Sequence, residues 1–404
     1  MTQDTVLFTV CNIAYLPKAL TLAESLYDSN GLTLNIVIID GIPAAKHQAQ
    51  KDGVPYAQIF YIEEFAVPNF AKLAFQYDII ELSTAVKPYL ALHFLAKSAT
   101  VIFLDPDTFV VGQVSVIVEE LGTNSILLTP HYTRPQARTA DESDLAMSRF
   151  GSFNLGFFAV RHCDEAFEFL RWWDARCQDF CFMESQFGLS TDQKWVAIAP
   201  CFFPNLKVSF HLGLNAAPWN SFERRLSKTN AGLVLNGQFP LIFYHFSNFD
   251  PNDLDYQNKR ASNEASGPDP VLHGLATQYL TATTSKVVPK VRYKFDYFAQ
   301  GDYISPSLRR AYYAMKSDFS EADDPFTSAE VYAFAKKNRL LQSNNTPYKL
   351  VGFRSIGKKP MSVRLLVRLM RLVLRIAGPN KFFDFSRLLV FLSLYWKNKD
   401  LWRL

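Results

Sequence analysis

The stretch Val101-Ile-Phe-Leu-Asp105-Pro-Asp107-Thr108-Phe-Val-Val111 places two carboxylates between two hydrophobic runs. The first run has the length and composition of a buried strand, so Asp105 and Asp107 are expected where that strand ends. Carboxylates about 4 Å apart repel by about 4 kcal/mol at an effective dielectric of 20. A hard divalent cation such as Mg²⁺ or Mn²⁺ removes that repulsion. A simple Asp-Pro-Asp turn explains the same residues, so the motif alone leaves both interpretations open.

Strand-like and helix-like segments alternate through the residues that lead to this motif. Apolar residues at helical spacing predict a first helix, and two more helices are predicted over 70–81 and 86–97. The βαβαβ order predicts an α/β fold with a sheet covered by helices on both faces. Ligand sites in such sheets lie at the carboxyl ends of the strands. The predicted strands and the apolar helix positions are Thr5–Cys11, Leu34–Ile39, Ala57–Ile62 and Val101–Leu104, and Ala19, Leu22, Ala23 and Leu26.

The rest of the chain is less regular. Residues 131–150 are polar without an apolar period, which predicts a long loop of the kind that often acts as a lid. A strand is predicted at Phe153–Val160, followed by a helix through Trp172-Trp173. Residues 251–270, rich in Asn, Asp, Ser and Pro, predict an exposed connection, and from about residue 290 the chain becomes helical and basic.

The formal net charge of +4 is the sum of a negative charge on most of the 404-residue chain and a larger positive charge on its C-terminal part. Residues 331–404 hold 16 Lys and Arg against 2 Asp, whereas the preceding residues hold 26 basic and 36 acidic side chains. An acidic body is not suited to nucleic acid, and a basic tail requires an anionic partner. No apolar run is long enough to span a membrane, and the first residues lack the pattern of a signal peptide.

The five cysteines show no spacing typical of a zinc site. They are expected to be free, buried thiols in a reducing cytoplasm.

Four apolar residues followed by Asp-x-Asp-x-Thr also describe the nucleophile motif of haloacid-dehalogenase-like phosphatases, in which the first Asp attacks phosphorus. In that family the motif opens the fold and leads into a helix. Here it follows 100 residues and leads into a second strand, Phe109-Val110-Val111. The phosphatase remains the weaker alternative for Asp105 and Asp107.

Seven segments in order make the sequence resemble the GT-A-type glycosyltransferases, most closely the bacterial family-8-like enzymes that use nucleotide-diphosphate sugars. The resemblance covers residues 5–251. It implies a Rossmann-like, mixed central sheet with helices on both faces. The segments are Thr9-Val-Cys-Asn12, Thr84-Ala-Val-Lys87-Pro88, Asp105-Pro-Asp107, Phe153-Asn154-Leu-Gly156-Phe, Thr191-Asp192-Gln193-Lys-Trp195, Leu214-Asn215-Ala-Ala-Pro-Trp219-Asn220 and Tyr244-His245-Phe-Ser247-Asn248-Phe-Asp-Pro251.

The resemblance implies a metal site and a catalytic pair. Asp105, Asp107 and His245 would hold Mn²⁺ or Mg²⁺, which neutralises the diphosphate leaving group; without the carboxylates, His245 would be interpreted as a core histidine. Asp192 and Gln193 would face the reacting carbon of the sugar. A neutral amide cannot act as a general base, which favours transfer with retention. Asp192 would orient sugar hydroxyls, or act as the base in an inverting enzyme.

The remaining implied contacts surround the donor. Thr9, Asn12 and Tyr15 would meet the base, and Asp40 the ribose hydroxyls; ordinary capping of strand-to-helix turns explains these residues equally well. Pro88 suits the first turn of a helix opened by Lys87, which would lie near the donor or simply in solvent. The sugar pocket and the closing motif would use Asn154 and Gly156, alternatively a β-turn, and Ser247 and Asn248.

The sequence departs from the family at two places. Asn248 stands where the family usually has Gly, and no Lys follows His245 until Lys259. Lys87, or Arg134 and Arg138 in the 131–150 loop, would then have to neutralise the phosphates.

The basic tail predicts an amphipathic helix. Arg364, Arg368, Arg371 and Arg375 recur at spacings of 4, 3 and 4 between leucines. Such a helix lies on an anionic bilayer; docking on the acidic body is the alternative. The expected domains are a catalytic domain over 1–250, a helical or irregular extension over 251–350 and a membrane-associating tail over 351–404.

The expected protein is a metal-dependent glycosyltransferase attached peripherally to the cytoplasmic face of the membrane. It would move a sugar from a UDP-sugar or similar donor to a cell-surface glycan or lipid-linked acceptor. The alternative outside the enzymes is a catalytically inactive GT-A fold that acts as a membrane-bound scaffold.

Overall fold

The computed structural model describes residues 4–40, 54–135, 143–230, 232–254, 269–286, 288, 292–342, 361–394 and 397–403. The chain forms two compact units. The first comprises residues 1–68 and 79–294, and the second comprises residues 69–78 and 295–404. Arg138, most of the connection predicted over 251–270 and residues 351–360 of the tail lie outside the described residues.

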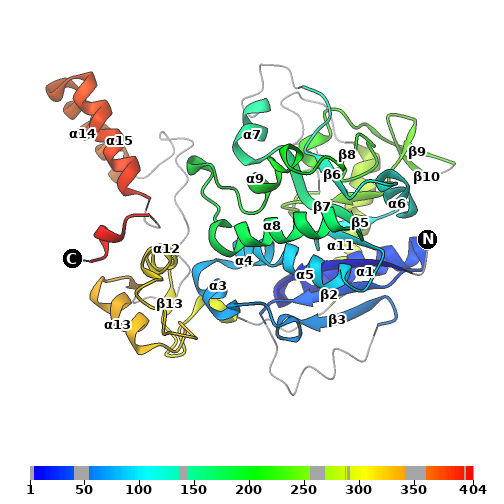
Figure 1. The fold of residues 1–404 in the computed structure, drawn as a ribbon. Helices are drawn as coiled ribbons and strands as arrows, with labels where there is room; N and C mark the ends of the chain where they lie inside the picture. Colours follow the sequence, from blue (N-terminus) through cyan, green and yellow to red (C-terminus); the bar gives the residue numbers. More distant parts are fainter. Residues whose placement is uncertain are drawn as a thin grey trace. The chain divides into compact units, whose positions relative to one another are not determined.

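A seven-stranded mixed sheet organises the first unit (Figure 1). Its strand order is β3-β2-β1-β4-β7-β6-β8. The first four of these strands run parallel to one another, β7 is antiparallel to both of its neighbours, and β6 is parallel to β8. The strands are β1 (Thr5–Cys11), β2 (Leu34–Ile38), β3 (Ala57–Tyr61), β4 (Thr100–Leu104), β6 (Ile126–Pro130), β7 (Phe153–Arg161) and β8 (Leu206–Val208).

Alternating residues of the strands form two hydrophobic layers, one on each face of the sheet. Leu7 and Cys11 of β1 pack in the layer that contains helices α1 (Leu16–Asn30) and α6 (Ser115–Leu121). Phe8 points the other way and contacts Phe94 of α5 (Lys87–Leu95) at a ring-centroid distance of 5.2 Å. On the same face, Phe158 contacts Trp173 of α8 (Asp164–Phe180) at 5.1 Å. The prediction of an α/β protein with helices on both faces of a mixed sheet is confirmed.

A short two-stranded ladder sets the position of the Asp-Pro-Asp motif. Strand β5 (Thr108–Val110) follows the motif directly and pairs antiparallel with β12 (Phe243–His245). In this register Thr108 lies opposite His245. The continuation of the motif into a strand, predicted from the sequence, is confirmed, and it brings His245 beside Asp107.

The remaining elements of the first unit lie around this framework. Helices α4 (Ile79–Ala85), α7 (Ser143–Phe150) and α9 (Gln193–Val196) join the larger helices, and α11 (Pro270–Thr284) begins at an Asp269 cap. A small antiparallel sheet contains β9 (Leu226–Thr229), β10 (Gly232–Leu235) and β11 (Phe239–Pro240). The short 3-10 helices are η1 (Ile13–Tyr15), η2 (Ile62–Phe65), η3 (Ser185–Phe187), η4 (Ala199–Cys201) and η5 (Pro218–Asn220).

The second unit has its own apolar core, in which Phe75 packs against Tyr312 and Phe298. The buried Arg309 guanidinium holds this unit together by donating hydrogen bonds to the carbonyls of Ala74, Phe75 and Tyr77. The elements of the unit are α3 (Phe70–Gln76), η6 (Lys294–Asp296, which spans the boundary), β13 (Tyr303–Ile304), α12 (Pro306–Met315), α13 (Ala329–Lys337), β14 (Leu341–Gln342), α14 (Met361–Ala377), α15 (Pro379–Leu392) and η8 (Lys399–Leu401).

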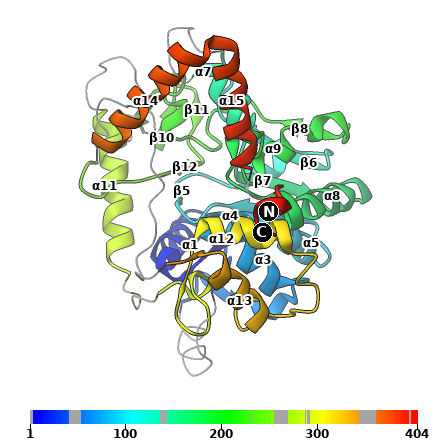
Figure 2. The same cartoon turned by 90° about the vertical axis from the view of Figure 1, so that its left-hand side faces the viewer.

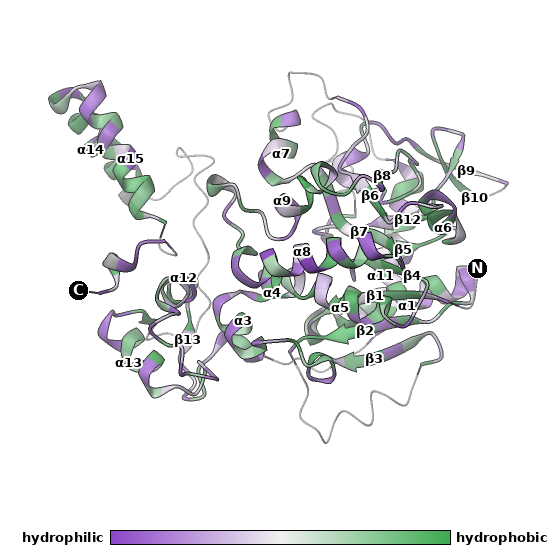
Figure 3. Cartoon of the chain, in the orientation of Figure 1, coloured by the Kyte–Doolittle hydropathy of each residue, from purple (hydrophilic) through white to green (hydrophobic). Residues whose placement is uncertain are grey.

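The tail forms the predicted helix over the arginine stripe and a second helix after it. Helices α14 and α15 meet in a bend at Gly378, which adopts a positive φ of 81° (Figure 2). Both helices mix hydrophilic and hydrophobic residues along their exposed surfaces (Figure 3). The chain beyond them returns to the core of the second unit, where Trp402 packs and Lys399 Nζ donates to Ser317 Oγ at 2.9 Å.

Three predictions about local structure are wrong. The single helix predicted over 70–81 is two helices, because Tyr77 is extended and its carbonyl is bonded by Arg309. The loop predicted over 131–150 contains α7, whose end is closed by the Gly151 N–H on the Met147 carbonyl. The cysteines are all free thiols, as predicted, but two of them are not buried: Cys163 is half-buried, and Cys201 is exposed because the short helix that it ends lies at the surface.

None of the helices in the described part of the chain combines the length and apolar character needed to cross a membrane.

Candidate functional site

Asp105, Asp107 and His245 converge at the carboxyl end of β4. One ligand atom from each of the three residues lies within 4.8 Å of the others. His245 Nε2 is 3.0 Å from Asp107 Oδ1 and 3.8 Å from Asp105 Oδ2. Two backbone bonds fix the cluster: Phe246 N–H donates to the Asp107 carbonyl at 2.8 Å, and Asp105 N–H to the Gly156 carbonyl at 2.8 Å.

In this cluster the His245 imidazole and the Asp107 carboxylate shift each other's pKa, and burial opposes both shifts. Burial disfavours a charged imidazole, but the carboxylates of Asp107 and Asp105 outweigh it and raise the pKa of His245. Burial likewise opposes ionisation of Asp107, and the His245 charge and hydrogen bond outweigh it, so the pKa of Asp107 is lowered. The cluster therefore favours an ionised Asp107 beside a positively charged His245.

The donor set fits a divalent cation. Two carboxylates and an imidazole offer the oxygen and nitrogen ligands that suit Mn²⁺ or Mg²⁺, and no thiol is among them. In the described residues this is the one group of three or more His, Cys, Asp or Glu side chains with such spacing. Asp105, Asp107 and His245 are the residues that would hold the ion.

Lys87 occupies the other side of Asp105. Its buried ammonium is 3.1 Å from Asp105 Oδ1 and 3.7 Å from Asp192 Oδ2, and it donates to the Leu155 carbonyl at 3.0 Å. It also lies over the Phe103 ring. Burial alone would lower the pKa of Lys87, but Asp105 and Asp192 raise it. Lys87 is thus a fixed cation between two carboxylates and not a solvated side chain.

Asp192 is almost fully buried at the start of α9. Burial raises its pKa to about 6, and the Lys87 charge opposes that shift. Thr191 Oγ1 donates to Asp192 Oδ1 at 3.1 Å, whereas Asp192 Oδ2 has no hydrogen-bond partner in the described structure. Thr191 itself has a φ of 46°, which is strained for a β-branched residue. A strained backbone thus presents a buried carboxylate beside Lys87, within electrostatic reach of Asp105.

Gly156 is required by its contact with His245. A Cβ at this position would lie 2.4 Å from His245 Cε1 and 2.8 Å from Asn154 Oδ1. The Asn154 side chain accepts a hydrogen bond from Gly156 N–H at 3.1 Å and another from Asn215 Nδ2 at 3.0 Å. Both predicted pocket residues therefore lie against the cluster of Asp105, Asp107 and His245.

Of the four residues predicted on the nucleotide side, Asn12, Tyr15 and Asp40 lie just beyond the ends of β1 and β2. Asn12 Oδ1 accepts from Tyr15 N–H at 3.1 Å, and Asp40 Oδ1 accepts from Ile13 N–H at 3.0 Å. Thr9 is fully buried within β1, with no hydrogen-bond partner for its hydroxyl in the described structure, whereas the Tyr15 ring is exposed. The capping contacts that the sequence offered as an alternative are present for Asn12 and Asp40.

Asp40 gives a pH-dependent stability prediction. Burial raises its pKa from 3.8 to about 6, so the folded state binds its proton more tightly than the unfolded state. The contribution of Asp40 to the free energy of unfolding should therefore fall as pH rises from about 4 to 6, by about 3 kcal/mol in total. Asp40→Asn keeps the oxygen that accepts from Ile13 N–H and removes the charge. Urea unfolding should show the variant more stable than wild type at pH 8 and equally stable below pH 4; a less stable variant at pH 8 contradicts this.

The remaining predicted site residues, Gln193, Ser247 and Asn248, lie next to Asp192 and His245 in the chain. Gln193 opens α9, and a Cβ on Gly151 would approach its backbone to within 3.0 Å. Ser247 and Asn248 follow His245, and Asn248 has a φ of 52°. Asn tolerates this left-handed conformation better than most residues other than Gly, so Asn248 can adopt the backbone that a Gly would adopt at this position.

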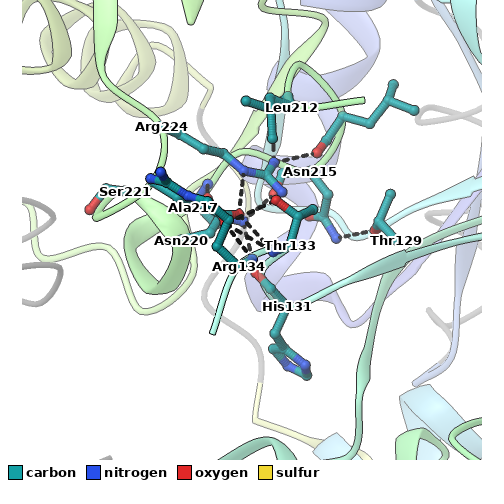
Figure 4. Close-up of polar contacts among 12 residues, drawn as sticks. Thr129, His131, Thr133, Arg134, Leu212, Asn215, Ala217, Asn220, Ser221 and Arg224 are labelled. Carbon is teal, nitrogen blue, oxygen red and sulfur yellow. Dashed lines mark hydrogen bonds and ion pairs between the residues drawn. The ribbon is translucent and has the colours of Figure 1, made fainter. Parts of the chain in front are cut away.

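A buried carboxylate ties the start of the 131–150 segment to the first unit. Glu223 accepts hydrogen bonds from Thr133 N–H at 2.9 Å and Arg134 N–H at 2.9 Å. Its neighbour Arg224 donates to the carbonyls of Leu212 and Leu214 at 2.9 and 2.7 Å (Figure 4). Because burial lowers the pKa of Arg224 only to about 10, it stays positive at neutral pH beside Glu223.

Three residues of the site have no role that the sequence predicts. Asn215 and Trp219 both contact His245, the first through a hydrogen bond of 3.2 Å and the second through its ring at 5.1 Å. Lys18 lies over the Tyr15 ring, and its charge adds to the larger effect of His245 in lowering the pKa of Asp107. The resemblance already included the segment with Asn215 and Trp219. Its position beside His245 follows from the parallel bridge between Ala216 and Tyr244 and from the His245 backbone N–H, which donates to the Ala216 carbonyl at 2.7 Å.

Comparisons with known proteins give two groups of similar chains. No protein-family model matches the chain. It is 29% identical over 203 residues to the uncharacterized protein YfnD of Bacillus subtilis (strain 168), covering 48% of this chain and 63% of that protein. It is 30% identical over 149 residues to the uncharacterized protein YfnF of the same strain, covering 37% of this chain and 49% of that protein. The alignments thus span between about half and two thirds of the curated relatives.

Two glycosyltransferases are among the solved structures to which the chain is similar. The galactosyltransferase LgtC, solved with donor and acceptor sugar analogs, has a TM-score of 0.43 and 15% identity over 70% of this chain and 97% of LgtC. The glycosyltransferase GlyE of Streptococcus pneumoniae TIGR4 has a TM-score of 0.40 and 16% identity over 70% of this chain and 63% of GlyE.

Proposed function

We propose that the protein is a metal-dependent glycosyltransferase that moves a sugar from a nucleotide-diphosphate donor, a UDP-sugar, to a glycan or lipid-linked acceptor with retention. The observation that supports this most is the convergence of Asp105, Asp107 and His245 at the carboxyl end of β4. In α/β sheets, ligand sites lie beyond the carboxyl ends of parallel strands such as β4. The Asp192 carboxylate is close to this cluster, because Lys87 pairs with both Asp192 and Asp105.

The charges of the site suit such a reaction. When bound, a divalent cation would neutralise the diphosphate as it leaves. Lys87 holds Asp105 and Asp192 in place through its two ion pairs. Asp192 would orient sugar hydroxyls, and the Gln193 amide, which cannot take a proton, would stabilise positive charge on the sugar carbon. In this assignment the leaving phosphate accepts the proton of the acceptor hydroxyl.

Donor hydrolysis tests the proposed activity. Purified protein would be incubated with a panel of UDP- and GDP-sugars, with Mn²⁺, with Mg²⁺ and with excess chelator. The proposal predicts release of nucleotide from at least one sugar donor, and loss of that release with chelator. Failure of every donor in the presence of metal refutes the proposed activity, and equal rates with chelator refute the metal requirement.

We further propose that α14 lies on an anionic membrane surface. Large apolar side chains on this helix are exposed, and they border the arginine stripe. Ile376 is 78% exposed and Leu365 is 65% exposed, which a helix buried by its neighbours would not show. Basic residues near an anionic surface contribute about 1 kcal/mol each, less with screening. The alternative of docking on the body is supported only for the end of the chain, at Trp402 and Lys399.

The membrane prediction is tested without deleting the tail, because Trp402 belongs to the core of the second unit. Replacing the four arginines of the stripe with Gln should weaken binding to vesicles containing phosphatidylglycerol at least tenfold, measured by sedimentation, while donor hydrolysis in solution stays unchanged. Lys336→Gln with Lys337→Gln on α13 is the control and should bind like wild type. Unchanged sedimentation of the arginine variant contradicts the prediction.

A further inference from the structure

The imidazole of His245 is confined on several sides. The backbone of Gly156 lies so close to the ring that any Cβ there would overlap it. The Trp219 ring meets it edge-on at 5.1 Å. These contacts restrict the plane of the imidazole, but they do not determine which ring nitrogen bears the proton. A metal ligand needs its lone pair on the nitrogen that faces the other ligands, here Nε2 beside Asp107.

A chain of hydrogen bonds determines the proton position, starting from a backbone donor. Gly156 N–H can only donate, so the Asn154 atom that it meets at 3.1 Å is the side-chain oxygen. The Asn215 atom that meets this oxygen at 3.0 Å must then be its amide nitrogen. The same nitrogen also donates to Thr129 Oγ1 at 3.1 Å (Figure 4). The other Asn215 atom is therefore an oxygen, and it can only accept.

The Asn215 oxygen faces His245 Nδ1 at 3.2 Å. Because an oxygen acceptor requires a proton on Nδ1, a neutral His245 has its lone pair on Nε2. The Asn215 backbone is held as well: Asn220 Nδ2 donates to the Asn215 carbonyl at 3.0 Å, and the φ of Asn215 is 52°. The orientation of Asn215 is thus fixed by hydrogen bonds of both its side-chain amide and its backbone carbonyl.

We propose that Asn215 is a positioning residue that selects the Nδ1–H tautomer of His245 and so directs Nε2 toward the cation. The proposal rests on the metal site of the proposed function. Outer hydrogen-bond partners of histidine ligands typically contribute 10- to 100-fold to metal affinity. We therefore expect Asn215→Gly to weaken Mn²⁺ binding by 10- to 100-fold. Glycine adopts a φ of 52° without strain, so this variant removes the amide and preserves the backbone.

The experiment measures free Mn²⁺ by electron paramagnetic resonance in titrations of the full chain without any sugar donor. Asn215→Asp retains an oxygen acceptor for Nδ1 but loses the amide nitrogen that donates to Asn154, so it should bind Mn²⁺ more tightly than Asn215→Gly and less tightly than wild type. Thr129→Val removes one donor-side contact of the amide and leaves its oxygen in place, so it should also bind nearly as wild type. Thermal unfolding of each variant identifies losses caused by misfolding. If Asn215→Gly does not fold, Asn215→Ala compared with Asn215→Asp makes the same test.

The outcomes separate the two proposals. Wild-type protein that fails to bind Mn²⁺ refutes the metal site of the proposed function, and the positioning role with it. Wild-type binding with equal affinity in folded Asn215→Gly refutes the positioning role alone. Equal losses in the Gly and Asp variants also refute it, because the acceptor oxygen would then be irrelevant. Loss in the Gly variant with recovery in the Asp variant supports it.

Discussion

Asp107→Asn should lower metal-dependent donor turnover by about 10³-fold or more. Metal stabilisation of a leaving group contributes several kcal/mol, and each 1.4 kcal/mol changes the rate tenfold. The variant preserves the shape of the side chain but removes one charge from the group that faces His245 Nε2 at 3.0 Å. Initial rates at saturating donor and at several Mn²⁺ concentrations measure the effect.

Asp174→Asn is the matched control for this variant. Asp174 is also a partly buried carboxylate of the first unit, and its partner is Gln178 on the same helix. It should turn over donor at the wild-type rate. Full activity of Asp107→Asn, or an equal loss in both variants, would show that Asp107 has no specific role with the metal.

Arg309→Met should destabilise the second unit by about 3–5 kcal/mol. The buried guanidinium donates to three carbonyls at the end of α3 and also to the Phe295 carbonyl and Asp296 Oδ1, at 2.8 and 2.9 Å. Methionine fills a similar volume but leaves these acceptors buried without a donor. Removing one partner of a buried hydrogen bond in this way lowers stability by the desolvation free energy of the group left behind. Chemical denaturation followed by circular dichroism measures the loss.

Arg403→Met is the control, because Arg403 forms an exposed ion pair with Asp318 at 3.3 Å in the same unit. Exposed pairs contribute between about 0 and 1 kcal/mol. If the two variants lose the same stability, the hydrogen bonds of Arg309 do not hold residues 69–78 in the second unit.

The sheet could be predicted because its signals are local. Each parallel strand is a short apolar run between polar turns, and the residues that alternate along β1 separate cleanly into two buried layers. The arginine stripe of α14 likewise has a helical period that the sequence states directly. The break between α3 and α4 has no such local signal, since the contacts that end α3 come from Arg309, more than 230 residues away.

The site was only partly accessible from the sequence. Asp105 and Asp107 form a recognisable motif, whereas the interpretation of His245 depended on a resemblance. Its place beside them follows from the antiparallel register of β5 with β12, which connects residues far apart in the chain. The role proposed for Asn215 has no sequence signal of its own, because it depends on which end of an amide faces Asn154 and which faces His245.

Lys87 shows how burial changes an interpretation. The sequence allowed it to lie near the donor or in solvent, and the absence of a Lys between His245 and Lys259 made it a candidate for phosphate neutralisation. In the structure its charge is already shared between Asp105 and Asp192. A bound diphosphate would therefore compete with two carboxylates for Lys87, and Lys18 is a further cation whose charge acts on Asp107.

Anomalous diffraction at the manganese edge, from crystals grown with Mn²⁺ and UDP, tests the central claim most directly. We expect one manganese peak at the carboxyl end of β4, coordinated by Asp105, Asp107 and His245 Nε2 and by oxygens of the diphosphate. Manganese and UDP bound elsewhere, or a peak that His245 does not coordinate, would contradict it.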